Sequence, residues 1–187
     1  MTLRYPLTVT TTLFIATSLD GFIAGPDDDL SWLFTDTDYG FDDFYSSVDA
    51  LVMGRGTYDV VRKLGKWPYA GKRTVVVTNK ENLETPTPDT EGFNGELKEL
   101  STTLAESGVK HCWLVGGGEL VVSCLHAGLI DTVTVSMHPV LLGQGVRLFP
   151  GSFPVTMLEF TDAQSFDSGL IQLNYRVVAT EGEFIED

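Results

Sequence analysis

Basic residues are scarce in this sequence. Twelve Lys and Arg residues stand against 26 Asp and Glu residues, and the formal net charge is -14. Such a surface repels polyanions at long range, so nucleic acids and acidic lipid surfaces are not expected as partners. A phosphate-bearing ligand would have to be held by local devices, namely helix N-termini, backbone amides and a few placed cations.

Cysteines and long apolar runs are also lacking. Cys112 and Cys124 are too few for a disulfide framework and show no C-x-x-C spacing. No stretch reaches 18 consecutive apolar residues, and the first 12 residues lack the apolar segment of a signal peptide. His111, His126 and His138 show no metal-ligand spacing. We therefore expect a cytoplasmic protein with no membrane span and no metal site.

What the chain does contain is a regular alternation of elements. Its 187 residues, 43% of them hydrophobic, predict one domain with one sizeable core. Apolar and β-branched runs predict strands at residues 8–18, 22–24, 50–53, 74–78, 112–115, 131–135, 155–160 and 170–179. Helical periodicity predicts helices at residues 39–48, 57–64, 96–107 and 119–127, with loops at 27–29 and 79–95. The predicted fold is α/β, with a mixed, mostly parallel sheet of about eight strands, flanking helices and a C-terminal antiparallel pair.

Two strand ends carry groups suited to phosphate. After the strand at 50–53, Gly54 allows close approach of a ligand, Arg55 offers a planar charged fork, and Thr57 can cap the next helix. After the strand at 74–78, the run Thr78-Asn79-Lys80 presents a hydroxyl, an amide and a cation. The alternatives are an ordinary capped helix with a surface Arg and a plain strand-to-loop junction.

A third strand end is rich in glycine. Gly116, Gly117 and Gly118 follow the strand at 112–115 and open a helix at Glu119. Without side chains there, backbone amides and the helix dipole can meet a pyrophosphate. A flexible turn is the alternative, although three glycines cost conformational entropy that a turn does not require. The run is not the dinucleotide fingerprint G-x-G-x-x-G.

Taken together, these motifs resemble the dihydrofolate reductase-like superfamily, and within it the stand-alone relatives of the reductase domain of bacterial riboflavin biosynthesis. The resemblance rests on Ala16-Thr17-Ser18-Leu19-Asp20-Gly21-Phe22-Ile23-Ala24, Met53-Gly54-Arg55-x-Thr57-Tyr58, the run from Val115 to Leu120 and the segment from Val140 to Phe149. It spans residues 8 to 179. It implies a three-layer fold, NADPH as the cofactor, and hydride transfer to a small heterocyclic acceptor, such as a pteridine or a pyrimidine riboflavin precursor, or to a carbonyl.

The resemblance also assigns cofactor residues. The turns at Gly54 and at Gly116 would hold the cofactor's phosphates, the latter with a cis peptide between its first two glycines, as is common in the family. The full set implied is Ala16, Ile23, Gly54, Arg55, Thr57, Thr78, Asn79, Lys80, Gly116, Gly117, Gly118, Glu119 and Leu120. Within it, residues 78–80 would lie beside the adenosine 2'-phosphate, and Ala16 and Ile23 would flank the nicotinamide.

The catalytic candidates follow from the same resemblance, and the substrate candidates also from residue type and position. The nicotinamide carries the hydride, so the protein mainly orients donor and acceptor and directs one proton. Dihydrofolate reductases hold the pterin with a carboxylate at the start of the helix before the Met-Gly-Arg strand, which makes Asp38 the first candidate and Asp42 the second; Asp20 is a further one. Each can instead be a helix-terminal or turn acid. Trp32 lines the substrate pocket, braces the loop at residues 25–34 or is simply a core residue. Arg147 either reaches a substrate phosphate or lies on the surface.

The sequence is also compatible with two other functions, and it predicts an assembly state. A non-catalytic module could retain the nucleotide cleft, and a true dihydrofolate reductase is disfavoured by the segment 140–149 and by the missing Pro-Trp pair before the helix. A homodimer is expected, because strands 131–135 and 155–160 add apolar residues to a sheet whose edge invites pairing. The alternative is a monomer whose edge is guarded by charge.

Overall fold

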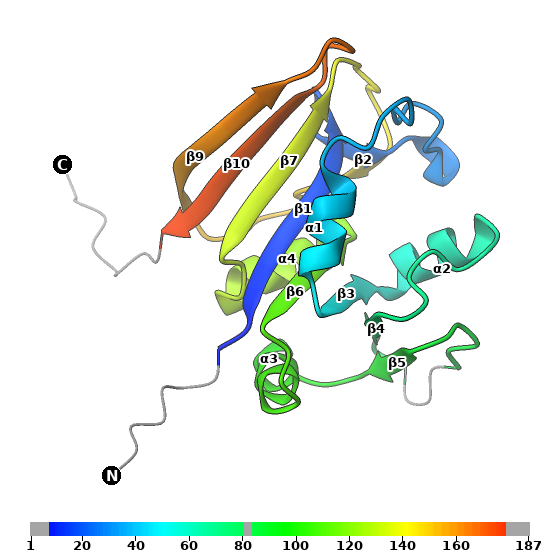
Figure 1. The fold of residues 1–187 in the computed structure, drawn as a ribbon, viewed down its shortest axis with the longest axis vertical. Coiled ribbons are helices and arrows are strands. Elements are labelled where there is room, and N and C mark those ends of the chain that lie inside the picture. The colour runs from blue at the N-terminus through cyan, green and yellow to red at the C-terminus, as the bar shows by residue number, and fades with distance from the viewer. Residues whose placement is uncertain (1–7, 81–83, 179–187) are drawn as a thin grey trace.

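The computed structural model describes residues 8–80 and 84–178, with ten strands and four α-helices among them (Figure 1). The strands are β1 (Thr10–Ser18), β2 (Phe22–Ala24), β3 (Ala50–Gly54), β4 (Arg73–Val77), β5 (Thr90–Phe93), β6 (His111–Gly116), β7 (Thr132–His138), β8 (Val146–Arg147), β9 (Met157–Ser165) and β10 (Ile171–Val178). The helices are α1 (Phe41–Ser47), α2 (Arg55–Lys63), α3 (Leu97–Glu106) and α4 (Gly118–Ala127), with a short 3-10 turn, η1 (Pro26–Asp28).

Eight of these strands form one sheet in the order β5-β4-β3-β6-β1-β7-β10-β9. The pairs from β5 to β7 are parallel, and β10 is antiparallel to both β7 and β9. β2 and β8 form a separate antiparallel pair. The predicted mixed, mostly parallel sheet with a C-terminal antiparallel pair is therefore confirmed.

Successive residues of the central strands enter two different apolar cores. In β3, Ala50 and Val52 belong to a larger core that also contains side chains of α3 and α4, whereas Leu51 and Met53 belong to a smaller one packed with α1 and α2. Because side chains of a strand alternate between its faces, the two helix pairs cover opposite faces of the sheet. Burial on both faces explains why these strands read as continuous apolar runs in the sequence.

The C-terminal part of the sheet is covered differently. All nine residues of β9 are exposed, and this strand forms one edge of the sheet. Its large apolar side chains include Met157, Leu158 and Phe160. In Figure 1, β9 and β10 extend beyond the helices, so this end of the sheet lacks the helical layers of the centre.

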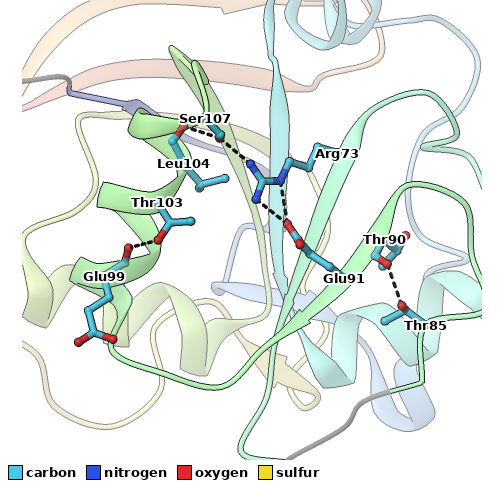
Figure 2. A network of polar contacts seen from close by, with 8 residues as sticks. All are labelled: Arg73, Thr85, Thr90, Glu91, Glu99, Thr103, Leu104 and Ser107. Atoms are coloured by element: carbon cyan, nitrogen blue, oxygen red, sulfur yellow. Dashed lines mark hydrogen bonds and ion pairs between the residues drawn. The ribbon is translucent and has the colours of Figure 1, made fainter.

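The prediction of a long loop at 79–95 was wrong, because β5 lies within it. β5 pairs in parallel with β4, from Thr74 opposite Thr90 to Val77 opposite Phe93. A side-chain tie supports this edge: the Nε of Arg73 donates to Glu91 at 2.7 Å, and its Nη1 donates to the hydroxyl of Ser107 after α3 at 2.6 Å (Figure 2). The strand is therefore held by its ladder to β4, by the Arg73 contacts and by Phe93, which packs against the larger core.

Other boundaries differ by a few residues. α2 begins at Arg55, two residues earlier than expected, and η1 overlaps the predicted loop at 27–29. Ala179, the predicted end of the last strand, lies outside the described residues. Within the described parts of the chain, no helix is long and apolar enough to cross a membrane.

Candidate active site

An open cavity of about 1000 Å³ lies at the carboxyl ends of the central parallel strands. Its wall combines the ends of β1, β3, β4 and β6 with parts of β2, η1, α1, α2, α4 and β8. Open α/β sheets bind ligands at this edge, where helix N-termini and loops converge. The volume is at the upper end of the range for small-molecule sites, which leaves room for an extended ligand.

The fold brings most of the predicted ligand residues onto this wall. Those that line it are Ala16, Ile23, Gly54, Arg55, Thr57, Thr78, Asn79, Lys80, Gly117, Glu119, Leu120 and Arg147. They come from positions spread over more than 130 residues of sequence. Gly116 and Gly118 are buried beside Gly117 and do not line the wall, and the peptide bond between Gly116 and Gly117 is cis.

The glycine run is packed closely against two other segments. A Cβ atom at Gly117 would lie 3.2 Å from Oγ1 of Thr57 at the start of α2. A Cβ atom at Gly118 would overlap the carbonyl oxygen of Arg147 and lie 2.9 Å from that of Leu148. Glycine is needed at position 118 for this close approach, and Gly117, the residue before α4, lines the cavity.

Basic side chains outnumber acidic ones on the cavity wall, in a chain whose net charge is -14. Arg55, Lys80 and Arg147 line it, whereas its acidic side chains among the described residues are Asp28 and Glu119. These cations oppose the repulsion that the negatively charged chain exerts on an anion.

Arg147 is held at the cavity by an aromatic ring. Its guanidinium carbon lies 4.7 Å from the centre of the Phe22 ring, within the range of a cation–π contact. Phe22 lies on β2 and Arg147 on β8, and the two residues are also paired in the β2–β8 ladder. The contact therefore fixes an otherwise exposed cation beside the cavity.

Aromatic side chains form another part of the wall. Phe14 of β1, Phe41 of α1 and Trp113 of β6 line the cavity. The Phe14 ring stacks on Phe44 with centroids 4.3 Å apart, and Nε1 of Trp113 donates a hydrogen bond of 3.0 Å to the carbonyl oxygen of Phe14. These contacts fix the rings from behind, so the wall offers a preformed apolar surface to a planar ligand.

Asp38 and Asp42 do not line the cavity. Oδ1 of Asp38 accepts a hydrogen bond of 2.8 Å from the backbone N–H of Asp42 in the first turn of α1. Both residues are exposed. The structure thus gives Asp38 the local helix-terminal role that was the alternative to a catalytic one, since a carboxylate there pairs with the otherwise unbonded amides of the helix start.

The carboxylate of Asp20 is hydrogen-bonded to the turn after β1 and to the segment before β8. Its carboxylate accepts hydrogen bonds from the Ser18 hydroxyl at 2.6 Å and from the backbone N–H groups of Leu142 and Gly143 at 3.1 and 2.7 Å. The Ser18 contact, followed by the two amides, lowers the pKa of Asp20 from 3.8 to about 2. Asp20 does not line the cavity. It fastens the turn after β1 to the segment before β8 as a carboxylate, and a group of this pKa is a poor proton donor near neutral pH.

Trp32 braces a loop and does not line the cavity. Its Nε1 donates to the carbonyl oxygen of Asp29 at 3.2 Å, and its ring meets that of His138 edge-on at 5.1 Å. Leu30 and Leu33, on either side of it in the sequence, do line the cavity. Trp32 therefore acts through the loop that it supports.

Several wall residues escaped the sequence analysis. Phe14, Phe41 and Trp113 were indistinguishable from core aromatics, because periodicity predicts a buried face without showing that a cavity opens onto it. Asp28 lay in an acidic run that indicated a solvated loop, and Ser123 carried no motif. Across the described residues, no group of three or more His, Cys, Asp or Glu side chains is arranged to hold a metal ion.

The arrangement of sheet, helices and cavity defines a dihydrofolate reductase-like fold. A dihydrofolate reductase from Enterococcus faecalis superposes with a TM-score of 0.65 over 94% of this chain and 99% of that one. The identity is 16%, so this likeness concerns the fold alone.

The family follows from comparisons of sequence. The family described as RibD C-terminal domain matches residues 9–172, and the chain belongs to it. The uncharacterised protein YwjB of Bacillus subtilis (strain 168) is 33% identical over 169 residues, which cover 88% of this chain and 96% of that protein. The crystal structure of a protein from Shewanella sp. PV-4 assigned to riboflavin biosynthesis superposes with a TM-score of 0.83. The two sequences are 30% identical, and the match covers 91% of this chain and 99% of the other.

Proposed function

We propose that this protein is an NADPH-dependent reductase that transfers a hydride to a small heterocyclic or carbonyl acceptor. The observation that carries the proposal is one cavity that combines cationic and glycine-lined strand ends with a preformed aromatic wall. The first set of groups suits the phosphates of a dinucleotide, and the second suits planar rings. Reductases of this family generally use a nicotinamide cofactor, which supports the choice.

The cofactor would occupy the strand ends nearest the glycine run. Backbone amides at the start of α4 and the hydroxyl of Thr57 would bind its diphosphate. Arg55 and Lys80 would bind the 2'-phosphate, which distinguishes NADPH from NADH. Ala16 and Ile23 would lie beside the nicotinamide, which supplies the hydride when the cofactor is bound.

The acceptor would lie against the aromatic wall. Phe14, Phe41 and Trp113 would orient a planar ring, and Leu30 and Leu33 would exclude water from one side of it. A pteridine, a pyrimidine of the riboflavin-precursor type or a conjugated carbonyl compound fits this description. Arg147 would bind a phosphate if the acceptor carries one.

The test is a titration followed by a turnover assay. Binding of NADPH should quench tryptophan fluorescence, because Trp113 lines the cavity, and should raise the melting temperature. Oxidation of NADPH is then followed through the loss of its absorbance with a panel of pterins, flavin precursors and carbonyl compounds. No binding at millimolar NADPH by either method would refute the proposal.

A second function, a cofactor-binding protein without catalysis, is favoured by one observation. None of the three predicted acids, Asp20, Asp38 and Asp42, lines the cavity. This candidate predicts NADPH binding without oxidation over the whole panel. Turnover by the wild-type protein would reject it, and turnover that persists in Asp38→Asn would agree with the exposed position of that carboxylate.

We further propose that the protein is a homodimer formed through β9 and β10. Val155, Met157, Phe160 and Ile171 expose large apolar surfaces on this end of the sheet. A second copy related by a two-fold axis would cover this surface with an identical one, as is common in soluble oligomers. A partner of this kind also protects an open sheet edge from uncontrolled pairing.

A further inference from the structure

Arg55, the cavity-lining cation of α2, is bound by a residue that no cofactor motif includes. Its Nε lies 2.6 Å from Oδ2 of Asp59, one helical turn further along α2. Residues four apart on a helix lie on the same face, which allows this contact. Arg55 lines the cavity and Asp59 does not, so the carboxylate holds the arginine from behind.

The contact uses only one of the donor positions of Arg55. Within residues 8–80 and 84–178, its two terminal nitrogens, Nη1 and Nη2, make no hydrogen bond. The guanidinium is planar, so a bond at Nε restricts the orientation of the whole group and leaves the outer edge free. That edge carries the two parallel N–H groups that suit a phosphate.

The two carboxylate oxygens of Asp59 have different surroundings, and only Oδ2 accepts a hydrogen bond. Its Oδ1 is buried and has no hydrogen-bond partner among the described residues. Arg62 approaches this oxygen at 3.6 Å, which is an ion pair and not a hydrogen bond. A buried carboxylate oxygen left without a hydrogen bond is unfavourable, and it persists here between two arginines.

We propose that Asp59 is a positioning residue, which holds the guanidinium of Arg55 so that Nη1 and Nη2 face the phosphorylated adenosine end of the cofactor. This inference rests on the proposed function. The carboxylate acts on the ligand only through Arg55, and it determines how strongly the site prefers a ligand with a 2'-phosphate over one without.

Charge and orientation predict opposite results when Asp59 is removed. A carboxylate near a phosphate repels it, so on charge alone Asp59→Ala would strengthen NADPH binding. Loss of orientation weakens it, because Arg55 must then be ordered at the moment of binding. A purely helix-stabilising role would lower the melting temperature and change the affinities for NADPH and NADH alike.

The experiment measures dissociation constants for two ligand pairs, NADPH with NADH and adenosine 2'-monophosphate with adenosine. In Asp59→Ala we expect binding of each phosphorylated ligand to weaken about tenfold, with its unphosphorylated partner changed less than about twofold. Asp59→Glu, which still reaches Arg55, should recover part of the loss. Arg62→Ala is the matched control, because it removes the second ion pair of Asp59 without touching the cavity wall, and it should change neither ratio.

Three results would overturn the inference. They are tighter or unchanged binding of the phosphorylated ligands in Asp59→Ala, equal weakening within each pair, and a wild-type protein without preference for the phosphorylated ligands. The proposed function fails separately. If the wild-type protein prefers the 2'-phosphate, loses that preference in Asp59→Ala and yet reduces no acceptor, the role of Asp59 stands and the reductase proposal does not.

Discussion

The side chain of His138 holds the backbone of Phe34 across 104 residues of sequence: its Nε2 accepts a hydrogen bond of 3.2 Å from the Phe34 N–H. Its Nδ1 lies 3.1 Å from the carbonyl oxygen of Ser136. An N–H can only donate and a carbonyl can only accept, so the neutral imidazole with its proton on Nδ1 satisfies both contacts. The loop that carries Leu30 and Leu33 to the cavity is thus fastened to β7 by a neutral histidine.

This contact predicts a loss of stability in mild acid. Burial lowers the pKa of His138 below its ordinary value of 6.5, with the Ser136 contact opposing in part. The unfolded chain therefore binds the proton more readily, and the His138 contribution to stability is complete above pH 6.5 and declines as the pH falls below it. Denaturant unfolding at a series of pH values should show this slope in the wild type, and His138→Gln should reduce it. An unchanged slope in His138→Gln would contradict this account.

The second prediction concerns cofactor choice. Arg55→Ala should weaken NADPH by roughly ten- to a hundredfold and NADH much less, because a charge-assisted hydrogen bond to the 2'-phosphate is worth about 1.5 to 3 kcal/mol. Isothermal titration with both cofactors measures the difference. Lys63→Ala, which removes an exposed cation from the same helix, serves as the control. Equal losses for the two cofactors would place Arg55 at the diphosphate or outside the site.

The third prediction tests the packing of the glycine run. Gly118→Ala should destabilise the protein by about 2 to 3 kcal/mol, because the new methyl group would collide with the carbonyl oxygens of Arg147 and Leu148. Gly56→Ala is the comparison, since a Cβ atom there meets nothing within 4 Å, and helix propensity should make it neutral or stabilising by up to about 1 kcal/mol. The unfolding curve should shift to lower stability in Gly118→Ala and should show no such shift in Gly56→Ala. If Gly118→Ala were as stable as Gly56→Ala, the backbone at Arg147 and Leu148 would be able to shift at little cost.

The fourth prediction concerns assembly. Light scattering should give a mass of about 41 kDa, twice the chain mass of 20.5 kDa. Phe160→Asp should favour the monomer, because it places a charge on a side chain that is 58% exposed on β9. Leu64→Asp changes a side chain of 68% exposure after α2 and should leave the mass unaltered. A wild-type mass of one chain over a tenfold concentration range would end the dimer proposal.

The sequence predicted the central strands because their residues are apolar on both faces, as in Val75 and Val76, whose neighbouring side chains enter different cores. It did not predict β5. Thr90 and Glu91 are polar, and prolines precede them, so the segment has no apolar pattern. Its strand conformation depends on the β4 ladder and on Arg73, and such tertiary contacts override local preference.

Some residues of the candidate site could likewise be recognised from the sequence, and others could not. Glycines and hydroxyls at strand ends could be recognised from residue type and position, as with Gly117 and Thr57, because backbone approach and helix starts need those residues. The carboxylates could not be assigned in this way. Asp38 and Asp28 lie ten residues apart in an acidic region, and only the course of the chain determines that the second lines the cavity and the first does not.

The position of β1 in the sheet affects how the protein folds during synthesis. This strand pairs with β6 and β7, so Thr10 lies opposite His111 and Thr12 opposite Thr132. β1 is therefore synthesised before both of its neighbours, and more than ninety further residues must follow Ser18 before β6 exists. Contacts this distant in sequence slow folding, because the chain loses loop entropy before the ladder compensates for it. A nascent chain halted before β6 would have an unpaired apolar β1 and no ligand cavity, so cofactor binding would report on completed synthesis.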